Sequence, residues 1–252
     1  MDKTKLIAAL ADKFDIEAFH DVSNNGLQVD SRRKEVKKVV TGVDATLPLF
    51  KAAVEAGADL VICHHGISWG DSLKRITGLN YDLVKFLMDH DLALWACHLP
   101  LDAHAELGNN AGLCNALGIV DRKPFGDYHG QLIGFSGRLP SPMARDAFAE
   151  LVRDKIGGTL KTALFGTETI GTVGVISGGA GGMVSQAADA GFDAYLDDEM
   201  DLVAYNICLQ RGINMFAPGH YATERFGVRA LGNWLASTFG LEHQFVDFDL
   251  PF

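Results

Sequence analysis

The stretch VKKVVTGVDATLPLFKAAVEAGADLVICHH, residues 36–65, decides the fold class. Its apolar runs at 36–46 and 58–65 predict two strands, and the segment 47–56 between them predicts a helix. Short connections of this kind are typical of right-handed crossovers between parallel strands. The stretch therefore predicts an α/β protein whose sheet is covered by helices.

The alternation of strands and helices continues on both sides of this stretch. Residues 1–14 carry apolar positions at helical spacing and predict an amphipathic first helix, and a last helix begins near His220. The other predicted helices lie at 81–90, at 109–118, at 141–158, before 190 and at 201–210. The other predicted strands lie at 92–98, 130–139, 159–165, 172–179 and 213–220.

Two segments of the chain resemble each other. EAGADLVICHH, residues 55–65, aligns with DAGFDAYLDDE, residues 189–199, which sets His64 and His65 opposite Asp198 and Glu199. A true repeat and the generic pattern of any two strand-helix-strand units explain this equally well. In both cases these side chains fall at strand ends, where α/β sheets usually form their sites.

These patterns predict one unit, 1–252, made of two similar α/β halves, 1–128 and 129–252. Each half is expected to have a mixed, mostly parallel sheet flanked by helices. A metal site, argued from the residues below, is expected in the crevice between the halves.

The chain is acidic, with 22 Lys and Arg against 32 Asp and Glu and a formal net charge of -10. This charge disfavours nucleic acid as a partner, but a metal or a helix terminus would still admit a small nucleotide or phosphorylated substrate. Charges interrupt the apolar stretches, so no membrane association is expected. The four cysteines form no C-x-x-C pair, which favours a reduced, cytoplasmic location.

His64 and His65 follow a predicted strand and precede Gly66. Successive strand side chains point to opposite faces, but a turn at Gly66 would let both imidazoles face one site and offer nitrogens to a transition metal. Adjacent histidines alone are weak evidence, because histidines are more often exposed or hydrogen-bonded core residues. Cys63 and Cys97, which precede site histidines, are interpreted as buried apolar residues.

Carboxylates are expected beside these histidines, because two divalent ions need negative charge to balance them. Asp102 lies four residues after His98, beyond a turn that contains proline; an N-cap of the following segment explains it equally well. His220 and Glu224 stand at i and i+4 at a helix start, which brings both to one side. The alternative for Glu224 is a residue placed only for the helix dipole.

The motifs NGLQV, GVDAT, ADLVICHHG, HLPLDAHAELGNN and GHYATE occur in this order. In them the chain resembles the NGG-interacting-factor-like family of dinuclear metal proteins, many of which carry the label type 2 homolog of GTP cyclohydrolase I. The resemblance spans essentially the whole chain, in the short form without a central insertion. It implies a toroidal homohexamer with two divalent metal ions in each subunit. The ligands that it implies are His64, His65, Asp102, His220 and Glu224, with His98 beside them in a supporting or catalytic role.

The chain departs from this family pattern in two places. Asp197-Asp198-Glu199 stands where many relatives have Thr-Gly-Glu, and the run either adds negative charge at the site or forms a solvated turn. HHGISWG replaces a His-His-Pro form, and Trp69 either keeps an aromatic side chain near the site or belongs to the core.

The ligand types suit Zn, Mn, Fe, Co or Ni, because imidazole and carboxylate are present without thiolate. A metal-dependent hydrolase with His98 as proton shuttle is the leading hypothesis. The resemblance implies hydrolytic opening of the GTP purine ring, and phosphoester hydrolysis suits the metals equally. The alternative is a non-catalytic hexameric metal-binding scaffold or regulatory protein, since no P-loop or GxGxxG motif fixes a substrate. DNA binding is a third reading that the charge supports only weakly.

Overall fold

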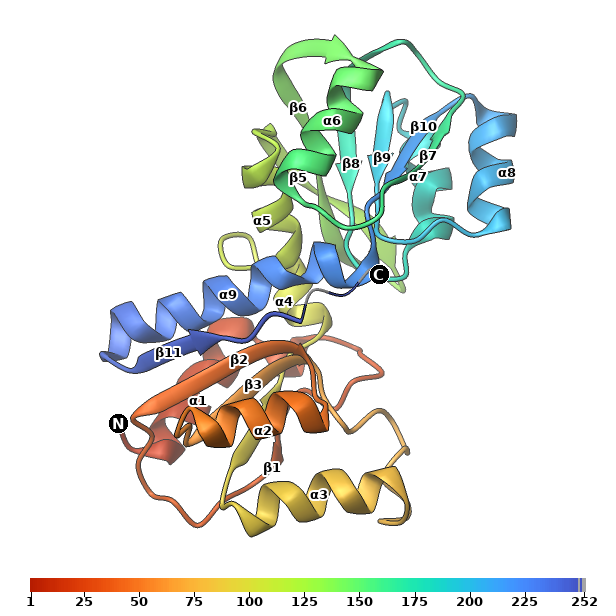
Figure 1. Cartoon of the computed structure of the whole chain (residues 1–252). Coiled ribbons are helices and arrows are strands. Elements are labelled where there is room, and N and C mark those ends of the chain that lie inside the picture. The colour runs from red at the N-terminus through yellow and green to blue at the C-terminus, as the bar shows by residue number, and fades with distance from the viewer. Residues whose placement is uncertain (249, 251–252) are drawn as a thin grey trace. The chain divides into compact units, whose positions relative to one another are not determined.

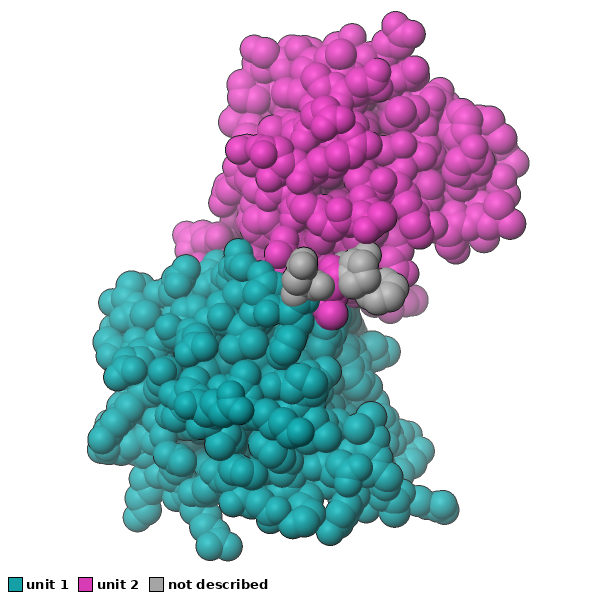
Figure 2. Space-filling model, in the orientation of Figure 1, with its two compact units in different colours: residues 1–101, 227–248 teal, residues 102–226, 249–252 magenta. Residues whose placement is uncertain are grey.

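The chain folds into two compact units (Figure 2). The computed structural model describes residues 1–248 and 250. Unit 1 comprises Met1–Leu101 and Gly227–Phe248, and unit 2 comprises Asp102–Phe226 with the described residue Leu250. The units do not coincide with the sequence halves 1–128 and 129–252, because the C-terminal strand belongs to the sheet of unit 1.

Unit 1 is built on a five-stranded sheet (Figure 1). Its strands are β1 (Gly26–Val29), β2 (Lys38–Asp44), β3 (Leu60–His65), β4 (Ala93–Ala96) and β11 (Glu242–Phe245). In the order β1-β4-β3-β2-β11, all strands are parallel except the antiparallel edge strand β1. The pairing of Val40 with Val61 confirms the parallel strand pair predicted within 36–65.

Helices cover both faces of this sheet, as predicted. The helices are α1 (Lys3–Phe14), α2 (Leu47–Glu55), α3 (Leu79–Asp89) and the C-terminal part of α9 (His220–Phe239), with a short 3-10 helix η1 (Ile16–Ala18). Alternate strand side chains serve the two faces. Val61 packs with Phe50 of α2, whereas Trp95 faces α1 and lies 6.1 Å from Phe14 between ring centroids.

Unit 2 is built on a six-stranded mixed sheet (Figure 1). Its strands are β5 (Val120–Tyr128), β6 (Gln131–Ala144), β7 (Lys161–Leu164), β8 (Thr169–Val175), β9 (Ala194–Leu196) and β10 (Asn214–Ala217). In the order β5-β6-β8-β9-β10-β7, strands β8, β9 and β10 are parallel, and the other neighbours are antiparallel. Mixed sheets are thus present in both units.

Helices α5 (Asn109–Ala116) and α6 (Arg145–Lys155) pack on one face of this second sheet, where the rings of Phe148 and Phe216 pack edge to face. Helices α7 (Val184–Asp189) and α8 (Leu202–Arg211) lie on the other face, after a short 3-10 helix η2 (Gly181–Met183) (Figure 1). Two of the unit boundaries lie within helices, one in α4 (Leu99–Ala103) and one in α9. In the described part of the chain, the helices are too short or too polar to cross a bilayer.

Each unit contains a β-α-β segment with an equivalent turn before its second strand. Gly57 and Gly191, with φ of 72° and 73°, end α2 and α7 in the left-handed conformation that favours glycine. Two residues later, Asp59 and Asp193 each accept two backbone N–H hydrogen bonds near the start of β2 or β8, over 2.7 to 3.1 Å. The same side-chain anchor in both units favours a true repeat over a generic likeness.

Two predicted boundaries are wrong. The helix expected to open at Ser141-Pro142 begins at Arg145, and the proline belongs to β6. The pairing of β6 with β8 is irregular between Arg138 and Met143, which accommodates a residue that has no N–H for the ladder. The strand expected to end at His220 ends at Ala217 instead, and His220 opens α9.

Candidate functional site

Three histidines gather at the C-terminal ends of the parallel strands of unit 1. His64 and His65 end β3, and His98 follows β4 by two residues. The ring centroid of His64 lies 4.7 Å from that of His65 and 5.1 Å from that of His98. One ring nitrogen of each histidine lies within 4.8 Å of those of the others. Adjacent strand residues therefore face one cluster, as Gly66 led us to expect.

The rings of His64 and His65 are each oriented through Nδ1. Nδ1 of His64 lies 2.9 Å from the carbonyl oxygen of Cys97, and Nδ1 of His65 lies 2.8 Å from Oδ1 of Asp44. An oxygen at this distance accepts a hydrogen bond from Nδ1–H, so Nε2 is the atom through which each ring would coordinate a metal. Histidines that bind metals are usually held in this way.

His98 is held by a buried aspartate from the loop before β1. Its Nδ1 lies 2.9 Å from Oδ1 of Asp21, and its backbone N–H donates to Oδ1 of Asn25. Burial raises the pKa of Asp21, but the hydrogen bond and charge of His98, with hydrogen bonds from Ser23 and Asn25, outweigh it and lower the pKa to about 2. Asp21 is therefore an ionised acceptor at neutral pH.

The loop after β3 is anchored on β1 by Gln28. Its Oε1 accepts hydrogen bonds of 2.8 and 3.0 Å from the backbone N–H groups of the two residues after Gly66. A Cβ atom at Gly66 would lie 2.2 Å from this oxygen, so glycine permits the close approach. Trp69 donates from Nε1 to the Gly66 carbonyl and lies edge-on to His98, with ring centroids 5.0 Å apart. Trp69 thus lies beside the histidines.

Cys63 and Cys97 are fully buried, as predicted. Cys63 packs among apolar residues of the core of unit 1. Burial, with a smaller effect from the charge of Asp44, raises the pKa of the Cys63 thiol well above its ordinary value. A protonated thiol is a poor metal ligand, so nitrogen and oxygen donors characterise this cluster.

Asp102 of unit 2 is fixed by a buried polar network. Nδ2 of Asn109 and Oγ of Ser177 donate to the same oxygen, Oδ1 of Asp102, over 2.8 and 3.0 Å. Asn110 in turn accepts a hydrogen bond from the backbone N–H of Ser177. The N-cap of α5 is Gly108, so the capping alternative for Asp102 is wrong. The network fixes the direction of this carboxylate by joining α4, α5 and the loop after β8.

His220 and Glu224 lie on one side of the first turn of α9, as their spacing predicts. Nε2 of His220 is 3.2 Å from Oε1 of Glu224, and carboxylate oxygens of Glu224 and Asp102 lie within 4.8 Å of each other. A Cβ atom at Gly178, where φ is +83°, would lie 3.2 Å from Glu224 Oε1. The loop after β8 therefore approaches this carboxylate closely, and Asp102, His220 and Glu224 form one group within unit 2.

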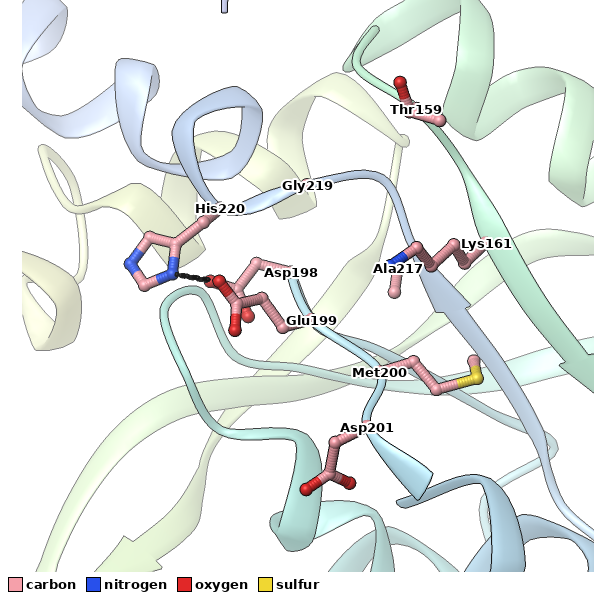
Figure 3. Close-up of a pocket in the computed structure, with 9 residues that line it drawn as sticks. All are labelled: Thr159, Lys161, Asp198, Glu199, Met200, Asp201, Ala217, Gly219 and His220. Atoms are coloured by element: carbon pink, nitrogen blue, oxygen red, sulfur yellow. Dashed lines mark hydrogen bonds and ion pairs between the residues drawn. The ribbon is translucent and has the colours of Figure 1, made fainter. Parts of the chain in front are cut away.

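The other side of the His220 ring faces the acidic run (Figure 3). Its Nδ1 lies 2.7 Å from Oδ2 of Asp198 and 3.1 Å from Oε1 of Glu199. Burial lowers the pKa of His220, but hydrogen bonds and charges from Asp198 and Glu224 raise it to about 12. The resulting imidazolium balances the surrounding carboxylates. A divalent cation bound at Nε2 would supply the same balance, with release of the proton.

The acidic run is largely buried, which contradicts the solvated-turn interpretation for its first two residues. Asp197 and Asp198 are 0% and 2% exposed. Burial, followed by the charge of Asp198, raises the pKa of Asp197 well above its ordinary value, and burial raises the pKa of Asp198 to about 6 in spite of His220. The departure from Thr-Gly-Glu thus places two buried carboxyl groups, whose ionised forms burial disfavours, in this run.

A pocket of about 380 Å³ opens beside this acidic group (Figure 3). His220, Asp198 and Glu199 line one part of it, and Lys161 and Thr159 line another. The volume suits a small molecule. Such a ligand would meet a cation on one side and carboxylates on the other.

Each unit brings together part of the predicted site. Unit 1 gathers His64, His65 and His98, and unit 2 gathers Asp102, His220 and Glu224. The metal centre expected in a crevice between two halves stays a prediction. Of the residues that orient these side chains, the sequence pointed to Asp198, as part of the acidic run. It did not reveal the other five, which are Asp21, Asn25, Asp44, Asn109 and Ser177. NGLQV, GVDAT and GNN carry three of them, but nothing in the sequence marked Asp21 or Ser177.

Known proteins resemble this chain over its full length. The model of the family described as Duf34/NIF3 (NGG1p interacting factor 3) matches residues 1–250. A relative from Deinococcus radiodurans named GTP cyclohydrolase 1 type 2 homolog is 39% identical, over 98% of this chain and 93% of its own. Two solved structures, a protein ybgI of unknown function and TTHA1606 from Thermus thermophilus, have TM-scores of 0.92 and 0.91 at 34% and 31% identity, over 100% of both chains.

Proposed function

Because the chain belongs to the Duf34/NIF3 family, we propose that it binds two divalent metal ions and uses them to hydrolyse a small substrate. The proposed ligands are His64 and His65 of unit 1 and Asp102, His220 and Glu224 of unit 2. His98 is the proposed proton shuttle.

The observation that carries this proposal is the common orientation of the histidines. His64, His65 and His220 each have an oxygen atom between 2.7 and 2.9 Å from Nδ1. Such an acceptor fixes the ring and makes Nε2 the coordinating atom, the arrangement typical of metal-ligating histidines. The nitrogen and carboxylate donors fit Zn, Mn, Fe, Co or Ni.

The chemistry proposed for the chain's own residues is proton transfer and orientation. Divalent ions held by these donors supply Lewis acidity, which activates water and stabilises developing negative charge. His98 lies beside His64 and Trp69 and would take the proton of the attacking water and return it to the leaving group. Lys161, on the wall of the pocket next to His220, would bind an anionic group of the substrate.

Two substrate classes follow from this proposal. The relatives named GTP cyclohydrolase 1 type 2 homolog favour GTP, with hydrolytic opening of the purine ring. Phosphoesters are the second class, because paired divalent ions suit the charge that develops in phosphoryl transfer.

The first experiment measures metal content and affinity. Purified chain stripped with a chelator and titrated with Zn or Mn should take up two ions, counted by inductively coupled plasma mass spectrometry. His65→Ala and Glu224→Ala should each lose at least one ion. His90→Ala, which removes an exposed histidine on the turn after α3, is the matched control and should keep both.

The second experiment measures turnover of GTP and of a generic phosphodiester by the loaded protein. His98→Ala should lower the rate while the metal content stays at two. Full metal loading with no turnover of either substrate class would favour the non-catalytic scaffold and overturn the hydrolase proposal.

We also propose that the chain assembles as a toroidal homohexamer, as the resemblance implies. With a subunit mass of 27.2 kDa, sedimentation equilibrium should give a particle about six times heavier. A monomer or dimer at micromolar concentration would overturn this assembly.

A further inference from the structure

Each of the two carboxylate oxygens of Asp21 has two hydrogen-bond partners. Its side chain is 1% exposed and sits in the loop between η1 and β1. Oδ1 accepts the backbone N–H of Ser23 and lies 2.9 Å from Nδ1 of His98. Oδ2 accepts hydrogen bonds of 3.0 Å from Nδ2 of Asn25 and from the backbone N–H of Leu99. One side chain therefore ties the loop before β1 to the turn after β4.

This contact determines which nitrogen of His98 carries a proton. An ionised carboxylate can only accept, so Nδ1 of His98 must donate, and Nε2 is then the basic nitrogen of the neutral ring. His98 cannot shift away from this arrangement easily, because its backbone N–H also donates to Asn25 over 2.8 Å. The ring stays within 5.1 Å of His64 and 5.0 Å of Trp69 between centroids.

The Asp21–His98 pair has a different proposed role from the Asp44–His65 pair. Asp44 orients a proposed metal ligand, whereas Asp21 orients the proposed shuttle. A buried carboxylate on Nδ1 holds the tautomer of a catalytic histidine and stabilises its imidazolium without taking the proton itself.

We propose that Asp21 is the positioning residue of His98, holding the Nδ1–H tautomer so that Nε2 accepts a proton from water and returns it to the leaving group. The inference rests on the proposed hydrolytic function. Asp21 stays ionised throughout, and the proton moves only between water, Nε2 of His98 and the leaving group. If the role of Asp21 were only to hold the two loops together, its hydrogen bonds with the backbone N–H groups of Ser23 and Leu99 would be enough.

The test compares Asp21→Asn with Asp44→Asn in the full chain. Magic-angle-spinning ¹⁵N NMR of histidine-labelled protein reads the tautomer, and His98→Gln assigns the signal. In the native chain His98 should be the Nδ1–H tautomer, and Asp21→Asn should give a mixture. Turnover by Asp21→Asn should fall about 100-fold or more with two ions still bound. Asp44→Asn should instead weaken metal binding by about 10- to 100-fold and leave the His98 tautomer unchanged.

Several results would overturn the inference. If Asp21→Asn keeps the His98 tautomer and turnover and only lowers the melting temperature, Asp21 only stabilises the fold by holding the two loops together. If it loses metal as Asp44→Asn does, His98 is a ligand and not a shuttle. Failure of the proposed function is separate, because it appears as absent turnover in the native chain.

Discussion

Oδ2 of Asp198 lies 2.7 Å from Nδ1 of His220, while Glu224 lies on the Nε2 side of the same ring. The sequence alone did not distinguish a solvated acidic turn from a change at the site. The contact adds Asp198 to the candidate site, as a group that orients His220.

Asp198→Asn should therefore weaken metal binding by about 10-fold or more, because loss of a carboxylate behind a ligating histidine typically costs that much. Competition with a chelating dye measures the affinity. Glu199→Gln is the matched control: its side chain is 64% exposed and lies farther from Nδ1, at 3.1 Å, so its effect should be smaller. Equal affinities for both variants and the native chain would contradict this role.

Ser177→Ala should lower the free energy of unfolding by about 1 to 2 kcal/mol, because it removes a donor from the buried Asp102 carboxylate. Urea unfolding of the metal-free chain provides the measurement. Ser185→Ala removes an exposed hydroxyl that donates only to a backbone carbonyl and should change the value little. If the two variants unfold at the same urea concentration, the hydrogen bond to Asp102 contributes little to stability.

Gly66→Ala should destabilise unit 1, because the new methyl group would force the Gln28 amide away from the backbone N–H groups that it holds. Loss of these hydrogen bonds should cost about 1 to 2 kcal/mol. Gly182→Ala, where a Cβ atom meets nothing within 4 Å, serves as the control in the same urea assay. A native-like unfolding curve for Gly66→Ala would show that Gln28 has another position available.

Asp21 should make the stability of the folded chain fall at low pH. Its pKa is lowered from 3.8 to about 2 in the folded state, so its stabilising contribution is complete above pH 3.8 and is lost as the pH falls towards 2. The shift corresponds to about 2 kcal/mol. Asp21→Asn should be less stable than the native chain at pH 6, and the difference should shrink between pH 4 and 2. A difference that does not change with pH would contradict this account.

The sequence predicted the elements that have strong periodicity. The segment 36–65 folds as β2, α2 and β3, because its apolar runs and its helix are each long enough to be distinguished. Three edge strands, β1, β5 and β11, were not predicted. Of these, β1 and β11 have only four residues each and are defined by their pairing with distant strands. The start of α6 was wrong because a proline in an irregular part of β6 gives the same local signal as a helix start.

For the candidate site, the sequence predicted the histidines and carboxylates but, apart from Asp198, not the groups that orient them. Asp102, His220 and Glu224 were predicted from spacing and family motifs, and unit 2 brings them together. Asp21 is 77 residues from His98 in the sequence, and Ser177 is 75 residues from Asp102. Contacts of this kind arise from the tertiary fold and leave no local periodicity to detect.

Anomalous diffraction from crystals soaked in Zn or Mn would show directly whether these residues bind metal. The proposed binding of two ions should give two anomalous peaks per chain, bonded to His64, His65, Asp102, His220 and Glu224 through nitrogen and carboxylate oxygen. Peaks elsewhere on the chain, or no peak at any of these residues after soaking at neutral pH, would contradict it.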